Sequence, residues 1–152
     1  MNHHPGQLKS INGIEYNIHN IPEGVILYPN WLDNINSGHP SILDCISSEI
    51  IYTLDTDTQN KCICTYSNTF NISSTQGMPP IQLKDSYVYR AFYNWGQPGV
   101  FNIKDIHTQK KWSFIVDTKM LLILHDPTHR YVVGCPYSDQ NRTVFSFSFK
   151  NI

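Results

Sequence analysis

The segment Lys111–Lys150 constrains the fold more than any other part of the chain, because strand-like blocks follow one another there with only short polar breaks. The blocks are KWSFIVDT, LLILHDP, RYVVGCPY and RTVFSFSFK. Each is too short for a stable helix and is rich in the β-branched and aromatic residues that suit a pleated, half-buried surface. In the last block, positions 143, 145, 147 and 149 hold Thr, Phe, Phe and Phe, with Val, Ser and Ser between them. This period of two residues predicts a chain that ends in a meander of antiparallel strands.

Further strand-like segments precede this one. They are expected at 45–54, 61–70, 83–95 and 100–106, with turn-rich breaks at 55–60, 73–80 and 96–99. No apolar i, i+3, i+4, i+7 pattern persists, which argues against a long amphipathic helix. We therefore predict one all-β domain over 1–152, with an irregular N-terminal arm at 1–30. Over 31–152 we expect an antiparallel up-and-down β-barrel of about eight strands, with a β-sandwich as the alternative.

The composition excludes several classes of protein. Charged residues make up 15% of the chain, its formal net charge is -1 and aromatic residues make up 12%, the opposite of a disordered chain. A protein that binds nucleic acid electrostatically should carry a basic stripe, and the sequence has none, so we expect no nucleic-acid partner. No apolar run has the length of a membrane helix, so the chain is not expected to span a membrane. The low net charge gives little repulsion between copies, which leaves a homo-oligomer open.

The cysteines bear on the compartment. The chain has four, Cys45, Cys62, Cys64 and Cys135, and two N-x-S/T sequons that begin at positions 71 and 141. This combination favours a secreted or lumenal glycoprotein with disulfides, although no apolar leader opens the sequence. Cys62 and Cys64 would share one face of a strand, which disfavours a bond between them, and the sequence leaves the pairing open. A zinc site would need a second cysteine pair at ligand spacing, which is missing.

The order of three motifs resembles the lipocalin family. The segment Asn30–Ile35 resembles the opening motif of the family, with Trp31 as its tryptophan. LLILHDPTHRYVVGCPY resembles the motif between the sixth and seventh strands, with Asp126 in the aspartate position. FSFSFKN resembles the closing motif, with Lys150 after the last strand, and Cys45 stands near a common cysteine position. The resemblance implies a barrel closed by Trp31, with Lys150 packed across the indole ring.

The resemblance also implies the function. It predicts a carrier that binds a small hydrophobic molecule, of the fatty-acid, retinoid or tetrapyrrole class, inside the barrel. Arg90 would either extend to solvent or meet an anionic head group such as a carboxylate. The alternative for each aromatic residue is a place in the core. The candidate ligand-binding residues are Tyr87, Tyr89, Arg90, Tyr93, Phe101, Trp112, Phe114, Phe145 and Phe147, and the candidate structural residues are Trp31, Lys150 and the four cysteines.

Other functions stay open at this point. A β-sandwich interaction module would use an exposed aromatic face to bind a protein or a glycan. A cysteine-dependent enzyme would pair Cys45 or Cys135 with a histidine at position 39, 125 or 129, but no flanking signature supports catalysis, and we expect no enzyme. Histidines at 107, 125 and 129 could hold a haem or another tetrapyrrole. Apart from such a ligand or a bound lipid, the sequence predicts no cofactor.

Overall fold

The protein is described from a computed structural model. This structure describes residues 8–11, 14–17, 21–31, 41–83 and 86–152. For the first two of these ranges it describes the backbone only. The described elements are β1 (Leu8–Ile11), β2 (Ile14–Asn17), β3 (Val25–Tyr28), α1 (Ile42–Thr58), β4 (Cys62–Ile72), β5 (Met78–Ile81), β6 (Tyr89–Asn94), β7 (Gly99–Asp105), β8 (Lys111–Val116), β9 (Leu121–His125), β10 (Tyr131–Cys135) and β11 (Arg142–Asn151). This part of the chain is therefore mostly β, with one helix.

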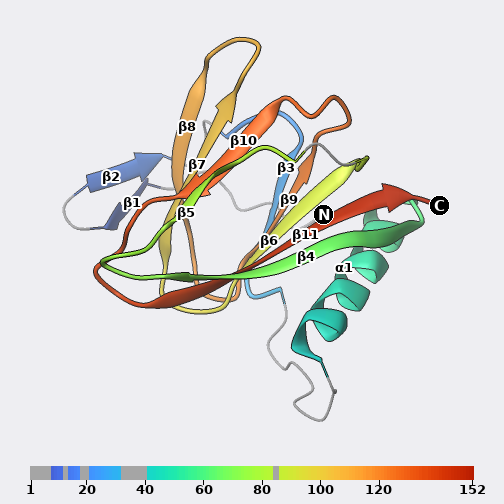
Figure 1. Cartoon of the computed structure of the whole chain (residues 1–152), viewed down its shortest axis with the longest axis horizontal. Helices are drawn as coiled ribbons and strands as arrows, with labels where there is room; N and C mark the ends of the chain where they lie inside the picture. The colour runs from blue at the N-terminus through green and yellow to red at the C-terminus, as the bar shows by residue number, and fades with distance from the viewer. Residues whose placement is uncertain (1–7, 12–13, 18–20, 32–40, 84–85) are drawn as a thin grey trace.

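Two antiparallel sheets form a sandwich (Figure 1). The larger sheet has five strands in the order β3-β9-β6-β11-β4, and the smaller has four in the order β5-β10-β7-β8. Apart from the β7–β8 hairpin within the smaller sheet, the chain alternates between the two sheets from β5 to β11, as in a jelly roll. An up-and-down barrel would pair strands that follow one another in sequence, whereas β11 pairs with β4 and β6. The predicted closed barrel is therefore wrong for the described strands, and the alternative, a sandwich, is the observed architecture.

The first core lies between the two sheets. Strand β7 shows how the sequence builds it, because Phe101 and Ile103 point inward while Asn102 between them is exposed. The Phe101 ring crosses to the larger sheet and meets Phe92 edge to face, with 5.7 Å between the ring centroids. Burial of one such side chain stabilises the fold by roughly 1.5–3 kcal/mol. The same core contains Val25, Leu27, Ile72, Met78, Phe114, Val116, Met120, Leu122, Leu124, Tyr131, Val133, Cys135 and Val144.

The second core lies between the larger sheet and α1, which covers the outer face of that sheet (Figure 1). Ser41 caps the helix by accepting a hydrogen bond from the backbone N–H of Asp44. Ile46, Ile50 and Leu54, spaced by four residues, form its fully buried stripe. The prediction of a strand over 45–54 is therefore wrong. Its β-branched residues suit a strand, but the spacing of four places their buried members on one side of a helix.

Strand β11 is an interior strand of the larger sheet, and its period of two is confirmed. It pairs with β4 on one side and with β6 on the other. Phe145, Phe147 and Phe149 face α1 and belong to the second core. Ser146 and Ser148 on the opposite face are buried between the sheets. The expected strands that correspond to β4 and β6–β10 are also present.

The N-terminal segment contains more structure than expected. Residues 1–30 were predicted to be irregular, but the described part of this segment holds the β1–β2 hairpin and strand β3, which pairs with β9. The division into one domain stays a prediction. Among the described residues, no helix is both long and apolar enough to cross a membrane.

Candidate functional site

The structure divides the predicted ligand-binding residues between two cores. Phe101 and Phe114 belong to the first core, and Trp112 packs against it in partial exposure. Tyr89, Tyr93, Phe145 and Phe147 belong to the second core, beneath α1. Tyr87 and Arg90 lie together at one end of the sandwich, with the Arg90 Cζ 5.9 Å from the centre of the Tyr87 ring. The nine residues therefore do not line a common cavity.

Trp31 and Lys150 occupy separate environments. The Trp31 indole N–H donates to the Thr53 hydroxyl at 3.1 Å, and its ring meets Tyr93 edge to face. Lys150 is exposed near the end of β11, where it lies opposite Ile63. The cation–π contacts found among the described residues do not include this pair. Trp31 therefore packs against the helix and the larger sheet, without the lysine that the lipocalin resemblance implied.

The predicted disulfides are wrong, because all four cysteines are free thiols. Cys62 and Cys135 are buried, and Cys45 and Cys64 are half-buried. Burial raises the pKa of the Cys135 thiol to about 12, although Arg142 acts in the opposite direction. Burial also raises the pKa of Cys62, and Asp55 adds to the increase. These environments stabilise the thiol forms, which are poor nucleophiles.

Alkylation with iodoacetamide provides a direct test of this thiol chemistry. At neutral pH the native protein is expected to label Cys135 about a thousandfold more slowly than an unfolded control, because the thiolate fraction falls tenfold for each unit of pKa. Half-buried Cys45 should label faster than Cys135 in the same sample. Peptide mass spectrometry after timed labelling, with and without denaturant, measures both rates. Native labelling of Cys135 at the unfolded rate would contradict the burial described for it.

Arg90 is the most unusual side chain in the sandwich. It projects from β6 into the space between the sheets and is 0% exposed. Its Nη1 donates to the carbonyl oxygens of Ile81 on β5 at 3.3 Å and Tyr131 on β10 at 3.5 Å. The guanidinium also lies over the Phe92 ring, 5.2 Å from its centre. Arg90 thus links the larger sheet to the smaller one. The sequence left two possibilities for this side chain, and the first of them, extension to solvent, does not occur.

Among the described carboxylates, buried Asp126 is the one that interacts electrostatically with Arg90, but it does not hydrogen-bond to the guanidinium. Its Oδ1 accepts from the Arg130 backbone N–H at 2.9 Å, and its Oδ2 accepts from the Tyr131 backbone N–H at 3.1 Å and the Tyr87 hydroxyl at 3.2 Å. Burial lowers the pKa of Arg90, while Tyr87 and Asp126 act in the opposite direction. Within the described part of the chain, no carboxylate bonds directly to Arg90, so its charge is compensated at a distance.

Three polar atoms at this end of the sandwich have no hydrogen-bond partner among the residues that the structure describes. They are Nε and Nη2 of Arg90 and Oγ of Ser148. Arg90 and Ser148 are direct neighbours across the β6–β11 pair, so both side chains project from the same face of the sheet. The two arginine atoms can only donate, and the hydroxyl can donate or accept, so an acceptor placed between them could bond to all three. We call Arg90, Ser148, Tyr87 and Asp126 the interior cluster.

The sequence pointed to part of this cluster. Arg90 stands out as a lone charge in a strand-like apolar segment, and a carboxylate was one of its two expected partners. Ser148 and Asp126 were missed as site residues, because their approach to Arg90 depends on strand pairing and on the turn after β9. The sequence did contain a pattern that could have identified Ser148. Ser146 and Ser148 alternate with phenylalanines, which leaves small polar residues on the interior face of the strand.

A second buried arginine lies at the other end of the sandwich. Arg142 is 4% exposed and donates to Asn94 Oδ1 at 3.3 Å and to the Val100 carbonyl at 3.0 Å. Its guanidinium lies over the Phe101 ring, 5.4 Å from the centre. Glycine at position 99 leaves room for it, because a Cβ there would lie 2.1 Å from the Arg142 Cζ. Among the described residues, Nε is the one Arg142 nitrogen without a hydrogen-bond partner. This end of the sandwich therefore has fewer unpartnered polar atoms than the interior cluster.

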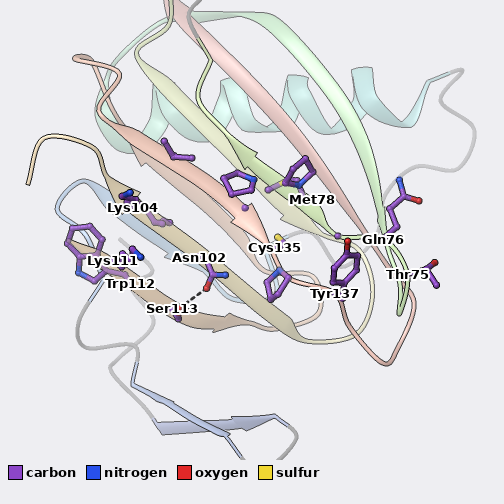
Figure 2. A pocket seen from close by; sticks show the side chains of 17 residues that line it. Thr75, Gln76, Met78, Asn102, Lys104, Lys111, Trp112, Ser113, Cys135 and Tyr137 are labelled. Atoms are coloured by element: carbon purple, nitrogen blue, oxygen red, sulfur yellow. Dashed lines mark hydrogen bonds between the residues drawn. The ribbon is translucent and has the colours of Figure 1, made fainter. Parts of the chain in front are cut away.

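A groove crosses the smaller sheet, with a volume of about 950 Å³ (Figure 2). One side carries Lys104, Lys111 and Trp112, and the other carries Tyr137 with Gln76. On its floor the Ser113 hydroxyl donates to Asn102 Oδ1 at 2.6 Å, between β8 and β7. The groove is lined from all four strands of the sheet and combines apolar walls with a few polar groups. We call it the sheet groove.

Comparisons with known proteins identify the fold. No family model matches the chain, and no curated protein sequence matches it. A viral collagen prolyl hydroxylase from Paramecium Bursaria Chlorella virus-1, in complex with 2OG, aligns with a TM-score of 0.59 and 9% identity over 86% of this chain and 97% of that one. A prolyl-4-hydroxylase from Pseudomonas putida aligns with a TM-score of 0.51 and 9% identity over 78% and 72%. An oxidoreductase of the 2OG-Fe(II) oxygenase family from Burkholderia pseudomallei aligns with a TM-score of 0.52 and 8% identity over 74% of this chain, which spans 53% of that protein.

These comparisons correct three predictions. The lipocalin resemblance is wrong, because the solved structures named above, which share this architecture, are prolyl hydroxylases and a member of the 2OG-Fe(II) oxygenase family. The hydrophobic carrier is wrong with it, since it depended on a barrel that the described strands do not form. The expectation that the chain is not an enzyme is contradicted as well, because the matching structures are enzymes. At identities of 8–9% the similarity establishes the fold alone, which is the jelly roll of the 2OG-Fe(II) oxygenases.

Proposed function

We propose that this protein binds a small carboxylate of the 2-oxoglutarate class between its two sheets, with Arg90 as the anchor. The observation that carries the proposal is the set of unmatched donors at the interior cluster, namely Nε and Nη2 of Arg90 beside Oγ of Ser148. A buried donor without an acceptor costs about 1–3 kcal/mol, and more when it is charged. A ligand that supplies acceptors would remove this cost.

The identity of the unmatched atoms favours a carboxylate. Nε and Nη2 form one edge of the guanidinium, and two parallel N–H···O bonds from such an edge match the two oxygens of a carboxylate. The remaining nitrogen, Nη1, is already held by the Ile81 and Tyr131 carbonyls, which fixes the direction of the open edge. Ser148 adds a neutral donor that could rotate toward the same anion. The solved viral hydroxylase that shares the fold was crystallised with 2OG, which supports this ligand class.

The charge balance supports the same conclusion. Arg90 is fully buried, and Asp126, the described carboxylate that interacts with it electrostatically, uses both oxygens on other donors. A buried charge is costly unless it is paired and hydrogen-bonded. An anion at the interior cluster would give Arg90 a directly bonded counter-charge. The binding energy would come mainly from this pairing and less from apolar burial.

Iron, which the name of the oxygenase family implies, does not fit the described residues. They contain no group of three or more His, Cys, Asp or Glu side chains placed to hold a metal ion. At the interior cluster the one carboxylate is occupied by three donors, and His129 Nε2 is hydrogen-bonded to the Tyr87 carbonyl at 2.9 Å. Two of the three unmatched atoms at this cluster are donors on the Arg90 cation, which attracts anions and repels metal ions. The proposal therefore concerns carboxylate binding, and no oxidation step follows from it.

Thermal unfolding and calorimetry with 2-oxoglutarate, without added metal, test the proposal. At a ligand concentration a hundred times the Kd, the protein should gain about 2.7 kcal/mol, which raises Tm by roughly 5–10 °C. Succinate should act similarly, whereas the dimethyl ester of 2-oxoglutarate should not, because it lacks the carboxylates. Phosphate and sulfate serve as comparison anions. Equal shifts from all anions would reduce the proposal to nonspecific ion binding and overturn it.

Ser148→Ala is the matched variant. It removes an unpartnered buried hydroxyl, so the stability without ligand should be unchanged or slightly higher. Affinity for 2-oxoglutarate should nevertheless fall about tenfold, because a hydrogen bond to a charged group is lost. Arg90→Gln should abolish binding, and a circular dichroism spectrum checks that this variant still folds. Unchanged affinity in both variants would exclude the interior cluster as the site.

A further inference from the structure

The sheet groove carries an arrangement of positive charge that is unfavourable within one chain. Lys104 on β7 and Lys111 on β8 are directly opposite each other in the antiparallel pair, and both line the groove. Like charges in directly opposite positions of neighbouring strands destabilise a sheet. The described residues that line the groove include no aspartate or glutamate. None of the ion pairs formed between described residues involves either lysine. The groove is therefore complementary to an anionic surface.

Helix α1 carries the opposite arrangement. Its sequence, ILDCISSEIIYTLDTDT, has four acidic residues and no basic one. Asp55 and Asp57 lie in the last turn, where the negative end of the helix dipole disfavours them. Glu49 and Asp55 are exposed on the face away from the sheet, together with Tyr52, which is 69% exposed. The outer face of α1 is thus acidic around one large aromatic side chain.

One molecule cannot bring these two surfaces together. Helix α1 packs on the outer face of the five-stranded sheet, whereas the groove opens on the four-stranded sheet, on the other side of the sandwich (Figures 1 and 2). A second copy of the chain can, because its α1 can lie across the groove of the first. Lys104 and Lys111 would then face Glu49 and Asp55 of the other copy.

We infer that the protein self-associates head to tail, with the outer face of α1 from one copy docked in the sheet groove of the next. The contact relieves both unfavourable charge arrangements at once. Tyr52 supplies an apolar anchor for the groove, whose far wall contains Pro79, Pro80 and the exposed Tyr137. Because the two surfaces differ, the contact is heterologous and generates chains or closed rings of copies. This inference is independent of carboxylate binding at the interior cluster.

Sedimentation velocity of the full chain at increasing concentration, in low and high salt, tests the inference. The weight-average mass should rise with concentration at low salt and fall toward the monomer at high salt, since opposite charges drive the contact. Two variants with neutral substitutions separate the surfaces. Lys104→Gln with Lys111→Gln alters only the groove, and Glu49→Gln with Asp55→Asn alters only the helix. Each variant alone should be monomeric at concentrations where the natural chain associates.

The mixture of the two variants is the decisive sample. The groove variant keeps an intact helix and the helix variant keeps an intact groove, so an equimolar mixture should form a dimer that cannot extend. A control pair, Lys61→Gln with Lys150→Gln, changes the net charge by the same amount as the groove variant but lies outside the groove. Its association should be unchanged or stronger. A natural chain that stays monomeric at low salt, or a variant mixture that stays monomeric, overturns the inference.

Discussion

Replacing Asp126 with alanine is expected to lower the free energy of unfolding by about 3–5 kcal/mol. The side chain is 1% exposed and accepts hydrogen bonds from the Arg130 and Tyr131 backbone N–H groups and from the Tyr87 hydroxyl. Its loss leaves these donors unmatched and removes a negative charge that interacts with the buried Arg90. Both effects act on the same end of the sandwich. Chemical denaturation of the purified variant, followed by circular dichroism, measures the change.

Two milder variants divide this effect into parts. Tyr87→Phe removes one of the three donors and should cost about 1 kcal/mol, as expected for a single hydrogen bond. Asp126→Asn keeps the shape and one acceptor but loses the charge, so its cost should fall between those of the other two. If Asp126→Ala costs no more than Tyr87→Phe, then Asp126 does not compensate Arg90, and the electrostatic description of the interior cluster is wrong.

Phe147→Ala is expected to cost about 3–5 kcal/mol, the range for truncating a buried phenylalanine. Phe147 is 0% exposed in the second core, at the centre of β11, and it stacks on Phe149 with 6.2 Å between ring centroids. Truncation would open a cavity between the larger sheet and α1, where the surrounding strands can relax little because β11 is paired on both sides. Equilibrium chemical denaturation, followed by the circular dichroism signal of the helix, measures the loss of stability.

The control for this prediction is Ile63→Ala on the neighbouring strand β4. Ile63 is 41% exposed and opposite Lys150, so its truncation should change the stability by no more than about 0.5 kcal/mol. A similar cost at both positions would show that β11 does not organise the core. Phe147→Ala should also lose helical circular dichroism signal before denaturant is added, in addition to the shift of its denaturation midpoint. The reason is that α1 depends on this core for its burial.

Strand positions were the most predictable part of this fold. Strands β6 to β11 fall where alternation, aromatic residues and turn signals placed them, because these signals act over a few residues. The helix was missed for a related reason. The segment 45–54 contains isoleucine and tyrosine residues that favour a strand, and only packing of Ile46, Ile50 and Leu54 on the larger sheet makes the helix stable.

The candidate sites depended on distant pairings. Arg90 could be singled out as a charge among apolar residues, but its neighbour Ser148 lies far away in the sequence and reaches it only through the β6–β11 pair. The opposed lysines of the groove likewise follow from the register of β7 and β8. A sequence pattern does not contain such registers, because each depends on which strands share a sheet.

The Lys111–Lys150 segment by itself determined that the chain is rich in antiparallel strands, and which residues of β11 face each side. Only the tertiary structure decided that these strands divide into two sheets instead of closing a barrel, and that β11 lies between β4 and β6. The physical reason is that alternation specifies the two faces of a strand but not its neighbours. The neighbours are selected by the burial of both cores together, which brings Arg90 and Ser148 into contact inside the sandwich.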